Sequence, residues 1–247
     1  MVMKMENNIT KNKTVGIVLF IMAIIGFVTV IYRIAGYQFE YNAQFTPHNW
    51  GRFNVLSYFT IESNLFACIY FLCVALAIFG NKKVEKFAFN PTVGAFVTLY
   101  VFIAGVTYNA GFPLKMTQPW TFDTPWHAFI SWLQIYFHII MVIAVLLLWL
   151  FPFRNEKLGK RCILLSGIYP LIYSSISMLR GSLIDGYFPY PFYDPQKVWG
   201  MFMASKPYNA AGAYGFIAIL LVFGISLFML FCAIFVFIHN KRIKAGD

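Results

Sequence analysis

The sequence predicts an all-α membrane protein, a bundle of six transmembrane helices with both termini in the cytoplasm. Three observations support this prediction. Of the 247 residues, 60% are hydrophobic and only 11% are charged, whereas a soluble domain carries about 25% charged residues. The apolar residues gather in six stretches, each close to the roughly 20 residues that a helix needs to cross the hydrocarbon core. Basic residues alternate between the two sides of these stretches.

The six expected spans organise the whole chain. No polar stretch between them is long enough to fold alone, so residues 1–247 are expected to form a single six-span transmembrane domain. The first span is longer than the apolar region of a signal peptide and no small-residue cleavage site follows it, so we expect it to be retained. The spans cover about residues 14–33, 55–79, 93–110, 126–151, 162–180 and 211–239.

The net charge of +10 indicates membrane topology rather than nucleic-acid binding. Because loops rich in lysine and arginine stay in the cytoplasm, the distribution predicts a multi-pass protein of the cell membrane with its N- and C-termini inside. Thirteen basic residues fall on the side of the termini, namely Lys4, Lys11, Lys13, Lys82, Lys83, Lys86, Arg154, Lys157, Lys160, Arg161, Lys241, Arg242 and Lys244. Six fall on the other side, namely Arg33, Arg52, Lys115, Arg180, Lys197 and Lys206.

Individual spans carry local signals. Span four has a clear start, because Thr124 can cap a helix and Pro125 suits its first position. Span five carries Pro170 in its middle, which removes a backbone hydrogen bond and should kink the helix. The cytoplasmic connections are short and basic, whereas the outer ones are longer and rich in aromatic residues and proline. This asymmetry predicts a ligand opening toward the outer face.

Polar side chains at helical spacing interrupt several spans. Lipid offers them no hydrogen-bond partners, so they should face the protein interior. Together they predict a polar cavity in the outer half of the bundle. The members are Ser57, Thr60, Ser63 and Asn64 in span two, Thr107, Tyr108 and Asn109 in span three, His127, Ser131, Gln134 and His138 in span four, and Ser166, Tyr169, Tyr173, Ser177 and Arg180 in span five.

Thr60 and His138 are the candidates for chemistry. A threonine hydroxyl becomes a nucleophile when a base lies within hydrogen-bond reach, and histidine is the natural base near neutral pH. His138 is the one histidine of four that lies deep in a span. At 1.5 Å per residue, Thr60 lies roughly 8 Å and His138 roughly 18 Å below the starts of their spans, which counts against direct contact. The difference shrinks if span four, which is long for a crossing helix, extends above the bilayer by a turn. The structural alternatives are a threonine bonded to its own helix and a histidine bonded to a neighbouring hydroxyl.

Glu62 and Arg180 are the other ionisable groups near the outer membrane half. Glu62 points away from the Thr60–Asn64 face, and its expected partner is Arg180 or Arg52. The fork of Arg180 could hold a carboxylate, and the alternative is that the side chain only reaches to the interface.

Three stretches resemble a known group of proteins. Tyr58–Asn64 (YFTIESN) resembles the YFTxxSN opening of span two in the bacterial Pr-six-Pr family of integral membrane proteins. Arg180-Gly181 followed by Tyr187–Pro195 (YFPYPFYDP) resembles that family's RG…YPYPFLDP segment. Trp132-Leu133 followed by His138 resembles the WLxxxxH of the eukaryotic androgen-induced proteins, which include the androgen-dependent regulator of tissue factor pathway inhibitor. With six spans in the same order, the resemblance covers most of the chain.

The resemblance implies a threonine hydrolase that acts on fatty acid esters of hydroxy fatty acids. It assigns the nucleophile to Thr60 and the required histidine to His138. In that reading Asn64, Tyr108 or Asn109 could donate to the developing oxyanion, and Arg180 could hold the free carboxylate of a fatty-acid substrate. The chain departs from the pattern at Tyr193, where leucine is usual, and it has no proline shortly after His138.

A non-enzymatic alternative uses the same outward polar cavity. A lipid- or small-molecule-binding or transport protein would also place histidine and arginine within the membrane. The expected partners are membrane lipids and a lipid ester or fatty acid, with no nucleic acid. The four cysteines show no metal or redox spacing, so no metal or cofactor is expected. The substrate and the oligomeric state are not defined by the sequence.

Overall fold

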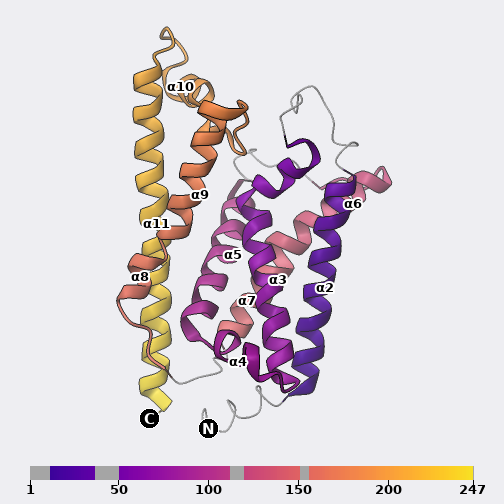
Figure 1. The fold of residues 1–247 in the computed structure, drawn as a ribbon. Coiled ribbons are helices and arrows are strands. Elements are labelled where there is room, and N and C mark those ends of the chain that lie inside the picture. Colours follow the sequence, from indigo (N-terminus) through magenta and orange to yellow (C-terminus); the bar gives the residue numbers. More distant parts are fainter. Residues whose placement is uncertain (1–11, 37–49, 112–119, 151–155, 247) are drawn as a thin grey trace.

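The computed structural model describes residues 12–36, 50–111, 120–150 and 156–246, and this part of the chain is helical without any strand. It contains six helical segments that are long and apolar enough to cross a membrane (Figure 1). This confirms the prediction of an all-helical protein with six segments that could span a membrane. The six segments are Lys13–Ala35, Phe59–Ile78, Pro91–Gly111, Pro125–Leu150, Arg161–Ile184 and Ala210–Ile243.

Side-chain caps fix the starts of several helices. Asn12 caps α2 (Lys13–Ala35) by accepting hydrogen bonds from the first backbone N–H groups of that helix. Thr124 caps α6 (Pro125–Ile135), with Pro125 in the first turn as the sequence predicts. Asn81 caps the short α4 (Lys82–Ala88). Asp194 caps α10 (Pro195–Met203), where Pro195 takes the first position. Each cap satisfies backbone donors that a helix start leaves unpaired.

Span two begins later than the sequence predicts. The expected start near residue 55 falls in a 3₁₀ helix, η3 (Gly51–Ser57), and the span itself is α3 (Phe59–Ile78). The extended residue Tyr58 separates the two. The hydroxyl of Tyr173 fixes this break, because it accepts from the N–H of Phe59 at 3.1 Å and donates to the carbonyl of Ser57 at 2.7 Å. Ser57 therefore lies outside the helical stripe of Thr60, Ser63 and Asn64.

Span five is interrupted rather than only kinked. It consists of α8 (Arg161–Leu165), α9 (Ile168–Leu179) and a π-helical turn, η5 (Arg180–Ile184). Pro170 has no N–H for the carbonyl four residues earlier, which is that of Ser166. The hydroxyl of Tyr100 donates to this carbonyl instead, at 3.2 Å. The backbone group freed by proline thus finds its partner in a neighbouring span.

Span four also contains a π-helical turn. The turn η4 (Tyr136–Ile140) lies between α6 and α7 (Met141–Leu150). A π-turn inserts one extra residue into a helix and is frequently found at functional sites. His138 is the central residue of this turn.

Two hydrophobic clusters hold the bundle together, and α5 (Pro91–Gly111) belongs to both. The first cluster joins α2, α3, α5 and span four. The second joins α5 and α7 to α8 and α11 (Ala210–Gly246). Figure 1 shows α8, α9 and α11 on one side of the bundle and α2, α3 and α6 on the other. The start of α2 and the end of α11 lie at the same end of the molecule.

Candidate functional site

Thr60 and His138 lie next to each other. Thr60 is the second residue of α3 and is half-buried, whereas the side chain of His138 in η4 is only 5% exposed. The Nε2 atom of His138 lies 3.3 Å from the Oγ1 atom of Thr60. Two residues separated by 78 positions in the sequence therefore form one polar contact inside the bundle.

The expected difference in depth does not prevent this contact. Thr60 is at the very start of α3, and His138 lies thirteen positions after Pro125, or about 20 Å along its helix. Span four crosses the bundle obliquely rather than parallel to α3, and its start lies out beside the upper end of α2 (Figure 1). Because an oblique helix descends more slowly, a residue far along it can reach the level of the α3 start.

The hydrogen bonds of His138 define its tautomer. Its Nδ1 atom lies 3.0 Å from the backbone carbonyl of Gln134, one helical turn earlier. A carbonyl oxygen can only accept, so Nδ1 carries the hydrogen of the neutral imidazole. The lone pair of Nε2 then faces the hydroxyl of Thr60. This is the arrangement of a base oriented by a third group toward a hydroxyl nucleophile.

Helix α5 holds His138 in place from the other side. The ring of Tyr108 stacks on the imidazole, with 3.8 Å between the ring centroids and 16° between the planes. The Nδ2 atom of Asn109 donates to the backbone carbonyl of His138 at 3.0 Å and to that of Gly105 at 2.8 Å. Both N–H groups of Asn109 are thus engaged. Tyr108 and Asn109 thus both contact His138 in this structure, and the oxyanion role expected from the sequence stays a prediction.

Asn64 and Ser63 surround the backbone of Thr60. The Nδ2 atom of Asn64 donates to the Thr60 carbonyl at 2.9 Å, and the hydroxyl of Ser63 donates to the same oxygen at 3.1 Å. Asn64 is fully buried, and its Oδ1 atom has no hydrogen-bond partner among the described residues. Such an unpaired buried acceptor is uncommon in folded proteins, and a hydrogen-bond donor of a ligand would satisfy it.

Tyr190 completes the surroundings of Thr60, and sequence periodicity does not reveal it. Burial raises the pKa of its phenol, and interactions with the hydroxyl and the backbone of Thr60 oppose that rise. Its ring packs edge-on against Tyr58, with centroids 5.7 Å apart. Tyr190 lies in the proline-rich segment between spans five and six. The only signal for it in the sequence is the resemblance of that segment to the YPYPF motif.

Arg180 is buried and bonded to several groups of the protein, so it is not a free cation. Its side chain is 4% exposed and pairs with Asp185, with 2.7 Å between Nη2 and Oδ2. The guanidinium also donates to Ser57 Oγ at 2.6 Å and to Asn54. It lies against the rings of Trp50 and Tyr187, at 4.1 and 4.5 Å from their centroids. The fork of Arg180 thus already holds a carboxylate of its own chain.

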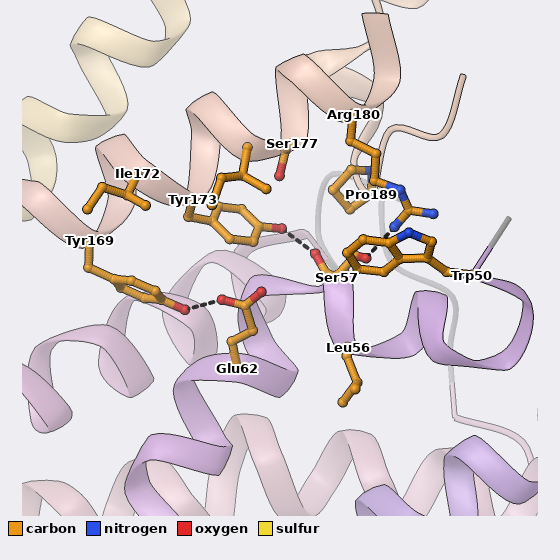
Figure 2. A pocket seen from close by; sticks show the side chains of 11 residues that line it. Trp50, Leu56, Ser57, Glu62, Tyr169, Ile172, Tyr173, Ser177, Arg180 and Pro189 are labelled. Atoms are coloured by element: carbon orange, nitrogen blue, oxygen red, sulfur yellow. Dashed lines mark hydrogen bonds between the residues drawn. The ribbon is translucent and has the colours of Figure 1, made fainter. Parts of the chain in front are cut away.

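A cavity lies between spans two and five. It has a volume of about 120 Å³ and is lined by residues of η3, α3 and α9 (Figure 2). Thr60 and His138 are not among the residues that line it, and spans three and four do not contribute. Glu62 faces this cavity and accepts a hydrogen bond from Tyr169 at 2.7 Å, so its partner is neither Arg180 nor Arg52.

No group of three or more His, Cys, Asp or Glu side chains in the described part of the chain could hold a metal ion. Comparisons with protein-family models, curated proteins and solved structures find no match to this chain. The geometry around Thr60 and His138 is therefore the main basis for a functional proposal.

Proposed function

We propose that this chain is an integral membrane lipid hydrolase that cleaves fatty-acyl esters with Thr60 as nucleophile and His138 as base. The observation that carries the proposal is the orientation of His138. Its Nδ1 atom is fixed by the Gln134 carbonyl, and its Nε2 atom lies 3.3 Å from the Thr60 hydroxyl. The resemblance of three short stretches to Pr-six-Pr and androgen-induced proteins supports the same reaction and suggests fatty acid esters of hydroxy fatty acids as substrates.

The reaction follows from this geometry in two stages. His138 takes the proton of Thr60, whose oxygen attacks the ester carbonyl and forms a tetrahedral intermediate. His138 then gives the proton to the oxygen of the leaving alcohol, and the carbon–oxygen bond of the ester breaks to leave an acyl-threonine. In the second stage His138 takes a proton from water. The resulting hydroxide attacks the acyl carbonyl, and the fatty acid leaves as Thr60 regains its proton.

The tetrahedral intermediate needs donors for its negative oxygen. One N–H of Asn64 is not used by the Thr60 carbonyl, and the phenol of Tyr190 lies close enough to Thr60 for its pKa to be affected by the threonine hydroxyl and backbone. Each good donor in a dry site is worth about 3–4 kcal/mol of transition-state stabilisation. We assign the oxyanion role to Asn64 and Tyr190 rather than to Tyr108 or Asn109, because the latter two hold His138.

The proposal includes an orientation in the cell membrane. The start of α2 and the end of α11 lie together, and the termini carry the basic side of the charge pattern (Figure 1). By the positive-inside rule, both termini are cytoplasmic. Thr60, at the opposite end of α3, then lies in the outer half of the bundle. A lipid ester would enter laterally from the outer leaflet.

Purified full-length protein tests the hydrolase directly. Thr60→Ala and His138→Ala should each lower the hydrolysis of a fatty acid ester of a hydroxy fatty acid by at least about 100-fold, because nucleophile or base is lost. A fluorophosphonate probe should label the wild type at Thr60. Thr29→Ala removes another buried threonine hydroxyl, which bonds only to its own helix, and should keep full activity.

Two outcomes would reject the enzyme. One is hydrolysis that persists in well-folded Thr60→Ala protein. The other is a folded wild type that neither labels nor hydrolyses, which would favour the non-enzymatic lipid-binding or transport alternative.

A further inference from the structure

A cavity lies on the side of α3 that faces away from His138. The cavity of about 120 Å³ between η3, the start of α3 and α9 has room for about four water molecules. Figure 2 shows Glu62 and Tyr169 pointing toward each other across it, with Tyr173 and Trp50 on its walls. None of these residues takes part in the proposed hydrolysis, so the site is independent of that reaction.

The carboxyl group of Glu62 on the cavity wall has no basic partner among the described residues. The hydroxyl of Tyr169 donates to Glu62 Oε2 at 2.7 Å, but no ion pair of Glu62 with a lysine, arginine or histidine exists among the described residues. The other charged group on the wall, Arg180, is neutralised by Asp185 at 2.7 Å. The lining therefore contains one carboxyl group without a cation. A carboxylate within a membrane is costly unless a positive charge accompanies it.

The walls of the cavity suit a cation that also has apolar surface. Tyr169 and Tyr173 contribute aromatic rings, and the faces of such rings attract ammonium groups, whereas Arg180 already lies against the ring of Trp50. A carboxylate together with aromatic walls is the combination that recognises primary and quaternary ammonium ions. The volume is sufficient for such a group but not for a whole lipid.

The position of the cavity indicates where the ligand comes from. Ile172 and Ile176 line it from α9, and their side chains are 51% and 56% exposed on the apolar face of that helix. In a membrane this rim faces the acyl chains of lipids. A headgroup can enter the cavity while its chains stay outside.

We propose that this cavity binds the ammonium group of a zwitterionic membrane lipid, with Glu62 as the counter-ion and Tyr169 as the residue that orients it. Phosphatidylethanolamine and phosphatidylcholine carry this group, whereas phosphatidylglycerol lacks it. The site is a lipid-binding subsite beside the hydrolytic pair and requires no hydrolysis.

Native mass spectrometry of the detergent-purified full chain tests this proposal. The probes are phosphatidylethanolamine, phosphatidylcholine and phosphatidylglycerol with identical acyl chains. The wild type should bind the two ammonium lipids about tenfold more tightly than phosphatidylglycerol, since one ion pair in a partly dry site is worth about a factor of ten. Glu62→Gln keeps the size of the side chain and should remove this preference. Glu85→Gln, which changes a carboxyl in α4 that pairs with Lys82, should retain it.

Further measurements separate the sources of the ammonium group and guard against misfolding. Choline chloride that displaces phosphatidylcholine would assign the site to soluble amines as well, and failure to displace it would restrict the site to lipids. Tyr169→Phe keeps the ring and should weaken ammonium-lipid binding several-fold even if Glu62→Gln folds poorly. Equal binding of the three lipids by the wild type, or unchanged preference in folded Glu62→Gln, would overturn the proposal. The rate of ester hydrolysis should be the same whether or not the cavity prefers ammonium lipids.

Discussion

Every polar atom of the His138 ring and backbone carbonyl has a defined partner, and these partners come from three elements. Gln134 sets the tautomer from within the same span, Thr60 faces Nε2 from α3, and Asn109 holds the backbone from α5. Tyr108 covers one face of the ring. In the proposed hydrolysis, an imidazole held in this way would lose little freedom on taking the proton of Thr60, which is the benefit of preorganisation.

The buried pair of Arg180 and Asp185 makes a prediction about stability. Their side chains are 4% and 2% exposed, so removal of one partner strands a charge in the interior. Arg180→Met should lower the free energy of unfolding by about 3–5 kcal/mol, and the additional change Asp185→Leu should restore part of that loss. Thermal unfolding in detergent, followed by fluorescence, measures both variants.

The surface provides a control for this pair. Lys197 and Asp194 lie 3.8 Å apart, and the lysine side chain is 64% exposed. Lys197→Met should cost at most about 1 kcal/mol, because solvent screens an exposed pair. A double variant of Arg180 and Asp185 that is less stable than either single variant would contradict the view that the pair acts as a unit.

Thr60 and His138 could be singled out from the sequence, whereas most of their contacts could not. Thr60 and His138 stand out because polar groups within apolar spans require a reason. The engagement of Asn109 with two backbone carbonyls depends on how α5 packs against η4, and the carboxylate held by Arg180 depends on a turn at Asp185. The hydrogen bond from Tyr169 to Glu62 forms because α9 places Tyr169 beside α3. These contacts are tertiary, so helical periodicity does not contain them.

At the scale of elements, the six spans were predictable because hydrophobic length and caps are local properties. The departures occur where a distant side chain acts on the backbone. The hydroxyl of Tyr173 separates η3 from α3, and the hydroxyl of Tyr100 accompanies the break between α8 and α9. The π-turn η4 also lies outside a period of 3.6 residues. A regular helical wheel therefore misplaces the side chains on either side of His138.

The close approach of α5 to η4 makes a prediction about Gly105. A Cβ atom at this position would lie 2.4 Å from Val142 Cγ2 and 3.0 Å from the backbone oxygen of His138. Gly105→Ala should lower the free energy of unfolding by about 1–3 kcal/mol, as overpacking does. It should also reduce the proposed ester hydrolysis, because the backbone of His138 must shift. The measurements are thermal unfolding and the rate of hydrolysis.

Gly215 is the matched control for this prediction. It is exposed on α11, and no atom would lie within 4 Å of a Cβ atom added there. Gly215→Ala should be neutral or stabilising by up to about 1 kcal/mol, because alanine favours a helix. Equal stability and activity of the Gly105→Ala and Gly215→Ala variants would show that the α5–η4 contact does not position His138.

At the scale of the whole molecule, the core of the bundle consists of two hydrophobic clusters that are joined by α5. Helix α5 belongs to both clusters and carries the residues that hold His138. The segment from Arg180 to Tyr190 follows α9. Arg180 donates to Ser57 of η3, and Tyr190 lies beside Thr60. The Thr60–His138 contact and the cavity that contains Glu62 therefore lie on opposite sides of the start of α3.

The orientation of this outer end is the last prediction, and it decides from which side substrate arrives. Thirteen of the basic residues fall on the side of the termini, which the positive-inside rule places in the cytoplasm. Lys83 at the start of α4 and Lys206 between α10 and α11 are exposed and lie on opposite sides in this arrangement. In intact cells, a membrane-impermeant maleimide should label Lys206→Cys but should reach Lys83→Cys only after the membrane is permeabilised. The wild type provides the background, since three of its four cysteines are buried and the fourth is half-buried. Labelling of Lys83→Cys in intact cells would show that the topology is the reverse of the one proposed. In that case the ester would reach the Thr60–His138 pair from the inner leaflet.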